Sequence, residues 1–194
     1  MKALVTGASG FIGSHVVAAL ASSGAEVRAF DRRAPADLPS GAEFAQGDLL
    51  DREALRRALA GCDAVFHLAA LYSYARGDAA AMERINVEGT RTLIEEAGSR
   101  RIVHTASCAT CGPVAGRAAN ETDSPAAWEL RVPYKRTKIA GERLALDAAA
   151  RGADIVVVNP TTPVGPGDRR PRRPARWWPM SPRVARGRTS QAAR

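Results

Sequence analysis

The sequence is poor in cysteine and contains no long hydrophobic run. Its three cysteines, Cys62, Cys108 and Cys111, are an odd number in a chain of 194 residues, which argues against a disulfide framework. No stretch of about 18 apolar residues is present to cross a membrane. No signal-type apolar segment closed by a cleavage site stands at the start. These absences predict a cytoplasmic protein with reduced thiols.

Positive charge is in excess, but only at one end of the chain. The formal net charge is +8 and the isoelectric point is about 10.2. Residues 1–167 contain 19 Lys+Arg and 19 Asp+Glu, whereas residues 168–194 contain nine Arg and one Asp. A nucleic acid or an acidic membrane needs basic charge on or beside a folded face. The neutral body therefore argues against such partners.

Short apolar runs alternate with longer segments of helical pattern. Gly24 and Gly61 stand where helices are expected to stop, and Asp51 is the expected cap at a helix start. This alternation predicts an α/β fold, a doubly wound parallel sheet with helices on both faces. Strands are expected at Ala3–Val5, Val27–Phe30, around Phe44, and at Ala64–His67, Ile102–His104 and Ile155–Val158. Helical faces are expected from Ile12, Val16, Val17 and Leu20, and from Leu50, Leu55 and Leu59.

The first strand runs into a G-x-x-G-x-x-G loop that opens a helix. Glycines suit a tight turn, a close approach of backbone to a pyrophosphate, and packing of the helix against the strand. The helix start then offers N–H groups to the phosphates. Such spacing also occurs in purely structural turns, but the strand and helix around it favour a dinucleotide site. The predicted cofactor contacts are Gly7, Ser9, Gly10, Phe11, Ile12 and Gly13.

The second strand ends in Asp31, where a carboxylate can bind the adenine ribose hydroxyls. A carboxylate there repels a 2′-phosphate and favours NAD. Arg32 and Arg33 follow at once and can neutralise such a phosphate, so NADP stays open. Arg32 is included among the predicted cofactor contacts.

Two further segments are candidates for the cofactor site. Asp48 and Leu49 follow the short strand around Phe44 and are placed to reach the adenine edge, although an aspartate there also commonly begins a helix. Leu68, Ala69 and Ala70 follow the fourth strand, and their small size lets the backbone approach a cofactor.

Tyr134 and Lys138 are four residues apart near a helix start, so their side chains share one face. A free tyrosine titrates near about 10, and a neighbouring ammonium stabilises its phenolate. Ser107 lies just past the fifth strand, at the edge where ligands bind in such sheets. Taken alone, this pair is typical of a solvated helix face and this serine of a loop. After a dinucleotide loop, they predict a catalytic set.

Together these segments resemble the extended short-chain dehydrogenase/reductase family, of the NAD-dependent epimerase/dehydratase type. Within it, the dihydroflavonol-reductase-like and hopanoid-associated sugar epimerase branch is the most similar. The resemblance covers residues 1 to 168. It rests on Thr6–Gly13, Asp48-Leu49, His67–Ala70, Asn86–Thr90, Ser107, Tyr134, Lys138 and Asn159–Pro166.

The resemblance implies a Rossmann-like NAD(P)-binding domain over residues 1–167 that contains the catalytic residues. Tyr134 would be the general acid/base, Lys138 would lower its pKa and bind the nicotinamide ribose, and Ser107 would orient the substrate. The hydride would move to or from the nicotinamide ring. The implied substrate is a sugar nucleotide or a related small polar metabolite, handled by an epimerase, dehydratase or reductase. A homodimer is compatible with the resemblance, and a catalytically impaired cofactor sensor is the alternative.

The resemblance also implies roles for two other segments. Asn86 would lie in the helix behind the active site, among the cofactor contacts. It is equally typical of a hydrogen bonder inside a helix. Pro160, Thr161 and Thr162 would form a turn that approaches the nicotinamide.

Residues 168–194 depart from the family, whose members continue with further strands and a substrate-binding domain. Their arginines and prolines predict no regular structure. Read one base back, the codons of Trp177–Pro182 permit an apolar helical sequence, so we hypothesise a frameshift between Asp168 and Arg173. The competing interpretation is a nucleic-acid arm with Trp177 and Trp178 for base stacking.

The remaining reactive side chains are assigned no function. Cys108 and Cys111 form a C-x-x-C, but without a second pair or a nearby histidine spacing they do not predict a zinc site, and no metal is expected. His15, His67 and His104 lie on separate elements and are interpreted as packing or strand residues.

Overall fold

A computed structural model describes residues 1–168 of the chain. The chain divides into two compact units, Met1–Val164 and Gly165–Arg194. The fold described below is that of the first unit. The expected irregular tail, the frameshift and the nucleic-acid arm concern residues that, from 169 onward, lie outside the described part.

Six parallel strands form one sheet in the order β3-β2-β1-β4-β5-β6. The direction in which strands are added reverses between β1 and β4, which is where ligands bind in open α/β sheets. The register aligns the carboxyl ends, since Thr6 lies opposite His67, and His67 lies opposite His104. The strands are β1 (Lys2–Thr6), β2 (Glu26–Asp31), β3 (Glu43–Gln46), β4 (Ala64–His67), β5 (Arg101–Thr105) and β6 (Ile155–Val158).

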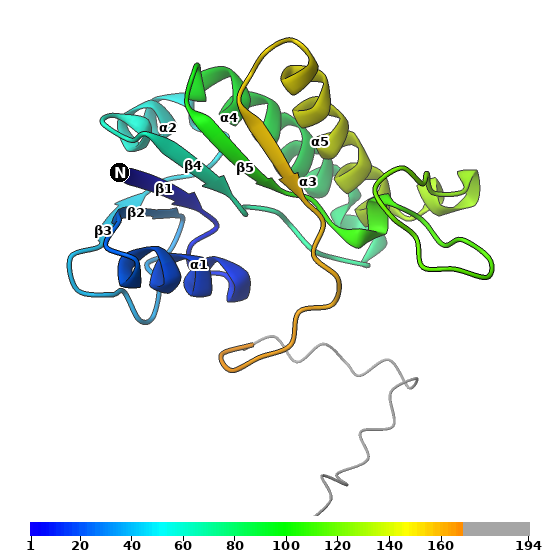
Figure 1. Ribbon diagram of the computed structural model, residues 1–194, viewed down its shortest axis with the longest axis horizontal. Helices are drawn as coiled ribbons and strands as arrows, with labels where there is room; N and C mark the ends of the chain where they lie inside the picture. Colours follow the sequence, from blue (N-terminus) through cyan, green and yellow to red (C-terminus); the bar gives the residue numbers. More distant parts are fainter. Residues whose placement is uncertain (169–194) are drawn as a thin grey trace, which may run out of the picture. The chain divides into compact units, whose positions relative to one another are not determined.

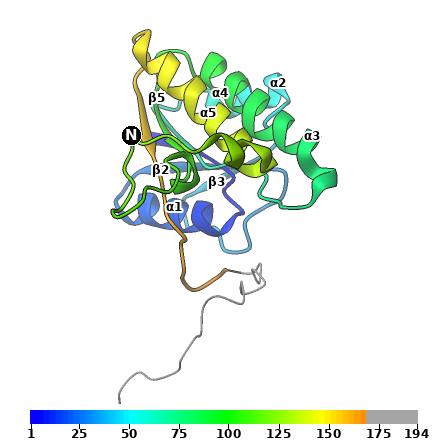
Figure 2. The same ribbon diagram turned by 90° about the vertical axis from the view of Figure 1, so that its right-hand side faces the viewer.

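Helices cover both faces of this sheet (Figures 1 and 2). On one face lies α1 (Phe11–Ser22), and on the other α2 (Arg52–Leu59), α4 (Gly89–Ala97) and α5 (Pro133–Ala150) pack side by side. A short helix, α3 (Ala79–Met82), continues through a π-helical segment, Glu83–Glu88, into α4. The predicted doubly wound α/β fold is confirmed.

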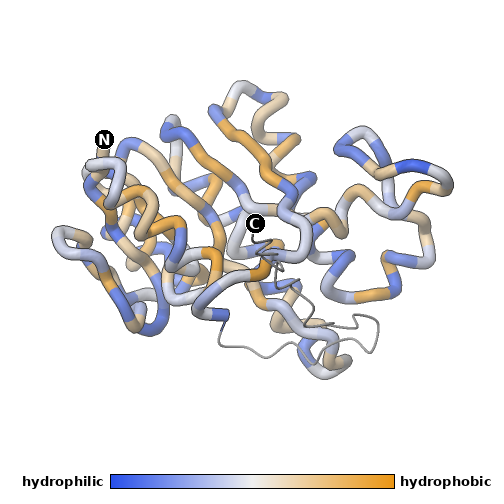
Figure 3. Tube along the Cα trace, turned by 60° about the horizontal axis from the view of Figure 1, so that its bottom comes forward, coloured by the Kyte–Doolittle hydropathy of each residue, from blue (hydrophilic) through white to orange (hydrophobic). Residues whose placement is uncertain are grey.

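Strands β1 to β4 supply side chains to two separate cores because successive residues point to opposite faces. Leu4 joins the cluster beneath α2 and α4, together with Leu55 and Leu93, whereas Val5 joins Val17 beneath α1. Hydrophobic segments accordingly follow the strands in Figure 3.

The helix ends follow the predicted local rules. The carboxylate of Asp51 accepts hydrogen bonds from the N–H groups of Glu53 and Ala54, which caps α2. Gly24 and Gly61 adopt positive φ angles of 82° and 72° directly after helices, a conformation that glycine adopts at little cost. Leu50 lies in the turn before α2 rather than in the helix.

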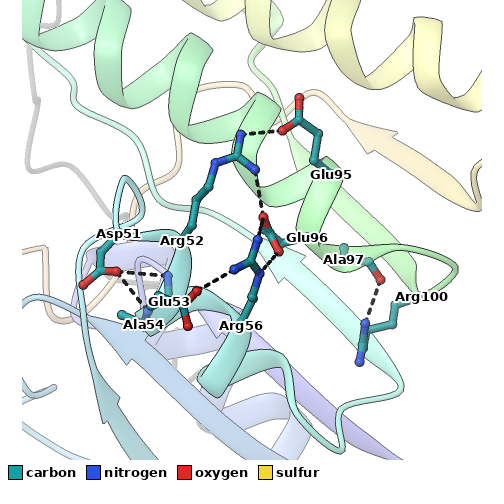
Figure 4. Close-up of polar contacts among 9 residues, drawn as sticks. All are labelled: Asp51, Arg52, Glu53, Ala54, Arg56, Glu95, Glu96, Ala97 and Arg100. Carbon is teal, nitrogen blue, oxygen red and sulfur yellow. Dashed lines mark hydrogen bonds and ion pairs between the residues drawn. The ribbon is translucent and has the colours of Figure 1, made fainter.

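Helices α2 and α4 are joined on the surface by a set of ion pairs (Figure 4). Arg52 pairs with Glu95 and Glu96, and Arg56 pairs with Glu96 and Glu53, at 2.5 to 2.8 Å. The two arginines lower the pKa of Glu96 by hydrogen bonding to its carboxylate.

Between residues 1 and 168, none of the helices has the length and apolar character needed to span a membrane. The cytoplasmic location and the homodimer stay predictions.

Candidate functional site

The loop after β1 is shaped by glycines that have no room for a side chain. A Cβ on Gly13 would lie 2.1 Å from the carbonyl oxygen of Gly7. A Cβ on Gly7, whose φ is +70°, would lie 2.7 Å from the backbone nitrogen of Ala69. Gly10 donates its N–H to the Gly7 carbonyl at 3.0 Å and precedes α1 without a side-chain cap. The start of α1 can therefore present backbone N–H groups to an anion.

Asp31 lies against this loop, although it is 22 residues from Ser9 in sequence. Its Oδ2 accepts hydrogen bonds from the Ser9 N–H at 3.0 Å and from the Ser9 hydroxyl at 2.7 Å. Its Oδ1 accepts the Arg32 N–H at 2.7 Å. The structure thus brings the carboxylate at the end of β2 together with the glycine loop, as a ribose site requires.

Asp48 and Leu49 contact other parts of the protein itself. Asp48 accepts the Leu50 N–H at 3.0 Å and shapes the turn that leads to α2. The Leu49 side chain is buried, and a Cβ on Gly89 would lie 2.6 Å from it. Asp48 thus has a structural role in the turn before α2, whose cap is Asp51, and the adenine contact stays a prediction.

The segment after β4 lies directly beside the glycine loop. Leu68 and Ala69 donate their N–H groups to the Thr6 hydroxyl at 3.2 and 3.3 Å. Leu68 and Ala69 are half-buried and Ala70 is exposed. The segment therefore lies beside the loop, with the N–H groups of Leu68 and Ala69 bonded within the chain, and its contact with a cofactor stays a prediction.

Asn86 is buried in the π-helical segment, and its side chain hydrogen-bonds to two other segments of the chain. Its Oδ1 accepts the Leu71 N–H at 2.7 Å, and its Nδ2 donates to the Leu71 carbonyl at 3.0 Å and to the Thr137 hydroxyl at 3.1 Å. All of these partners belong to the chain itself. The interpretation of Asn86 as an interior hydrogen bonder thus fits the geometry, and a direct cofactor contact stays a prediction.

Lys138 is buried on the inner face of α5. Its ammonium donates a hydrogen bond to the Thr105 carbonyl at the end of β5, at 2.7 Å. Burial lowers the pKa of Lys138 to about 8, and the charge of Glu142 opposes this shift. Tyr134 lies one helical turn before Lys138, so the carboxyl end of β5 lies against the helix face that carries both residues.

Ser107 begins a 3₁₀ turn, Cys108–Thr110, just past β5, and its hydroxyl accepts the Ala109 N–H. Asn159, after β6, donates from its amide to the Ser107 carbonyl at 3.2 Å and to the Glu142 carboxylate at 2.8 Å. Cys108 donates its N–H to the Pro160 carbonyl at 3.0 Å. The Ser107 turn and the segment that begins at Pro160 are thus side by side, whereas Thr161 and Thr162 are exposed.

All three tyrosines of the chain gather at one place. The ring of Tyr134 lies 4.6 Å from that of Tyr72 and 6.0 Å from that of Tyr74, measured between centroids. Tyr72 and Tyr74 are 42% and 64% exposed. Tyr72 and Tyr74 are two residues apart, but no spacing in the sequence places them beside Tyr134.

Two buried histidines lie side by side at the ends of β4 and β5, with ring centroids 5.3 Å apart. His67 contacts the hydroxyls of Thr6 and Thr90 at 2.8 and 3.0 Å. Neither ring nitrogen of His104 has a hydrogen-bond partner among the described residues. Burial lowers the pKa of both rings, that of His104 to about 3, so both are neutral.

The other reactive groups form no further site in the described part of the chain. Cys108 is exposed, Cys111 is buried, and both are free thiols. Within residues 1–168, no group of three His, Cys, Asp or Glu side chains is arranged to hold a metal ion.

Comparison with known proteins adds the family context. The model of the NAD dependent epimerase/dehydratase family matches residues 3–191. The chain is 42% identical over 178 residues to sterol demethylase protein B of Methylococcus capsulatus, covering 88% of this chain and 54% of that protein. It is 40% identical over 174 residues to a putative dihydroflavonol 4-reductase of Synechocystis, covering 86% and 50%. The chain therefore spans about half the length of these curated relatives.

Solved structures show the same architecture. MoeE5 in complex with UDP-glucose and NAD is 41% identical, with a TM-score of 0.69 over 81% of this chain and 52% of that one. The UDP-glucose 4-epimerase of Thermus thermophilus, in complex with NAD, is 30% identical, with a TM-score of 0.71 over 82% and 54%.

Proposed function

The chain belongs to the NAD-dependent epimerase/dehydratase family, and on that premise we propose that it binds NAD at the glycine loop and uses Tyr134 in hydride transfer. The substrate class we propose is a sugar nucleotide or a related small polar metabolite with a reacting hydroxyl or carbonyl. UDP-glucose is bound in a related structure, which supports this class. The homodimer and the cytoplasmic location belong to the same proposal.

The observation that carries the proposal is the hydrogen bond from the Lys138 ammonium to the Thr105 carbonyl. Thr105 ends β5 two residues before Ser107, and Lys138 lies one helical turn after Tyr134. This contact joins the helix face of Tyr134 to the segment of Ser107 at the carboxyl edge of the sheet. It supports a shared site for the three residues.

The residues at the glycine loop fit a dinucleotide. Gly7 and Gly13 leave no space for a Cβ, and the start of α1 has no side-chain cap, so backbone and helix dipole can face a pyrophosphate. Asp31 stands at the end of β2 beside the loop, where its carboxylate would accept hydrogen bonds from ribose hydroxyls. NAD, when bound, supplies the hydride acceptor.

The catalytic residues divide the remaining work. The Lys138 ammonium is mostly charged at neutral pH because its pKa is about 8, and a positive charge near a phenol favours the phenolate. Tyr134 would then take a proton from, or return it to, the reacting substrate oxygen. The Ser107 hydroxyl would donate a hydrogen bond to that oxygen and orient it.

We propose NAD as the preferred cofactor over NADP because Asp31 is fixed in place by Ser9 and by the Arg32 N–H. A carboxylate held there repels a 2′-phosphate. Competitive titration with NAD and NADP tests the preference, and an equal affinity for both would contradict it.

The proposal is tested by titrating the chain with NAD, followed by protein fluorescence. Turnover is tested by NAD reduction with UDP-glucose, in which the sugar hydroxyl is oxidised, and by NADH oxidation with a dihydroflavonol, in which the carbonyl is reduced. Tyr134→Phe is expected to abolish turnover while NAD affinity stays nearly unchanged. Tyr74→Phe is the matched control, since it removes a neighbouring phenol hydroxyl and should leave turnover measurable. Loss of both turnover and binding in Tyr134→Phe would contradict the role of Tyr134.

The alternative is a catalytically impaired NAD(P)-binding fragment or sensor. NAD binding without turnover of any tested substrate, unchanged by Tyr134→Phe, would favour it. Absence of NAD binding would overturn both forms of the proposal.

A further inference from the structure

Buried hydrogen bonds connect the end of β1 to the start of α5. The Thr6 hydroxyl lies 2.8 Å from His67 Nδ1, and His67 Nε2 lies 3.0 Å from the Thr90 hydroxyl. The Thr90 hydroxyl donates to the Asn86 carbonyl at 2.7 Å. This first part of the connection crosses from β1 through β4 to the helical segment before α4.

The second part runs from Asn86 to Tyr134. The Asn86 amide donates to the Thr137 hydroxyl at 3.1 Å, and that hydroxyl donates to the Tyr134 carbonyl at 3.0 Å. All five side chains in the connection are 0 to 3% exposed. They are Thr6, His67, Thr90, Asn86 and Thr137, and we call them the buried relay.

The partners of His67 determine where its proton lies. Thr90 has one hydroxyl proton and gives it to the Asn86 carbonyl, so it can only accept from His67 Nε2, which must carry a hydrogen. The unprotonated Nδ1 of the neutral ring then accepts the Thr6 hydroxyl proton. Thr6 keeps its oxygen lone pairs for the N–H groups of Leu68 and Ala69. Every donor in the relay thus has an acceptor.

We propose that His67 is a positioning residue which, as the Nε2-protonated neutral tautomer, couples the glycine loop to the helix that carries Tyr134 and Lys138. This inference rests on the proposed function, because the two ends that it couples are the proposed cofactor loop and the proposed catalytic helix. Thr6 directly precedes Gly7, and Thr137 lies between Tyr134 and Lys138. A shift at one end therefore disturbs hydrogen bonds that lead to the other.

His104 provides an internal comparison for this role. It lies opposite His67 in the register of β4 and β5 and is equally buried, at 3% exposed. Its ring nitrogens nevertheless have no partner in the described chain. Burial at this position of the sheet therefore does not by itself require a histidine to form hydrogen bonds, so the two hydrogen bonds of His67 need a separate explanation.

The first experiment compares His67→Leu with His104→Leu by fluorescence titration with NAD. His67→Leu should weaken NAD binding about tenfold, the equivalent of one or two lost hydrogen bonds. His104→Leu should stay within about twofold of the native chain. Thr90→Ser keeps the hydroxyl and should preserve the affinity that Thr90→Val loses. Equal effects of the two leucine variants would overturn the inference.

The second experiment measures coupling between the ends of the relay. Thr6→Val, Thr137→Val and the double variant are compared in the native and the His67→Leu chains, with NAD affinity and the free energy of unfolding without NAD as readouts. Distant, unconnected sites give additive effects. The relay predicts that the double variant is little worse than the more affected single variant, and that additivity returns in His67→Leu. Additive effects in the native chain would overturn it.

Nitrogen NMR of the histidine rings gives a readout that needs no variant and no cofactor. A His67 ring protonated at Nε2 alone is the expected signature, and protonation at Nδ1 would overturn the inference. If the chain does not bind NAD but shows this tautomer and non-additive unfolding energies, the proposed function fails while the relay stands. If NAD binds but His67 is protonated at Nδ1, the proposed function stands and the relay is overturned.

Discussion

The two sides of the carboxyl edge are held in shape by different means. On the loop side, Thr6–Gly13, the geometry requires residues without a side chain, since a Cβ on Gly7 or Gly13 would have no space. On the helix side, around Tyr134 and Lys138, it depends on buried polar side chains that bond one another. A steric requirement fails at once when an atom is added. Hydrogen bonds and buried charges depend on protonation instead. The loop side should therefore be sensitive to an added side chain, and the stability contributed by the helix side should depend on pH.

The largest effect is expected on the loop side, from Gly13→Ala. The new Cβ would lie 2.1 Å from the Gly7 oxygen. The neighbouring atoms belong to the backbone of Gly7 and Ala8, so relieving the clash requires the loop or the helix to shift. We expect a loss of about 3 kcal/mol in the free energy of unfolding and no detectable NAD binding, measured by denaturant titration and fluorescence. Gly77→Ala is the control, because nothing lies within 4 Å of its Cβ position. Comparable losses in both variants would refute the steric account.

The next effect belongs to the helix side and depends on pH. The pKa of Lys138 is lowered from 10.5 to about 8, so between these values the unfolded chain binds a proton that the folded chain has released. Stability should therefore rise with pH across this window, by about 3 kcal/mol in total. Lys138→Met should lack that rise relative to the native chain in unfolding titrations at pH 7.5 and 10.5. Parallel pH profiles of the two chains would contradict the burial of a charged lysine.

His104 should give a smaller effect on the acid side. Burial lowers its pKa from 6.5 to about 3. Between these pH values the ring is protonated in the unfolded chain and stays neutral in the folded chain. Stability is lost as the pH falls through this range, and at pH 5 the cost is about 2 kcal/mol. His104→Leu should lose correspondingly less stability than the native chain between pH 7 and 5. A variant that is equally acid-sensitive would show that His104 is not the responsible group.

The smallest effect is expected away from both sides, at the surface ion pairs of α2 and α4. Arg56→Ala removes pairs with Glu53, whose side chain is 67% exposed, and with Glu96, whose side chain is 10% exposed. The Arg56 side chain is itself 53% exposed, and pairs of an exposed arginine are screened by salt and cost side-chain entropy. The melting temperature should fall by no more than about 3 °C, less at high salt, with NAD affinity unchanged. A weaker NAD affinity would mean that this face communicates with the site.

The same contrast separates what the sequence could predict from what it could not. Gly7, Gly10 and Gly13 stand at recognisable spacing, and Asp31 follows at the expected distance, because the loop side is built from local backbone geometry. The fold was predictable for a similar reason, since the apolar runs identify each strand. Local patterns were sufficient there.

The helix side was only partly predictable. Tyr134, Lys138 and Ser107 are recognisable by residue type and position, but their supports are ordinary threonines, an asparagine and a histidine from distant segments. Thr6 and His67 are 61 residues apart, and Asn86 and Thr137 are 51 apart. No local spacing signals such pairs, so the sequence alone identifies His67 only as a packing or strand residue and allows two interpretations of Asn86.

The tyrosine cluster has a consequence for how the molecule can be observed. The chain has three tyrosines, and all of them lie together around Tyr134. Ultraviolet absorbance of ionised phenols, or nitration of tyrosine rings, would therefore report from this one corner of the molecule alone. The protein contains its own optical reporter, placed where the proton transfer is proposed to occur.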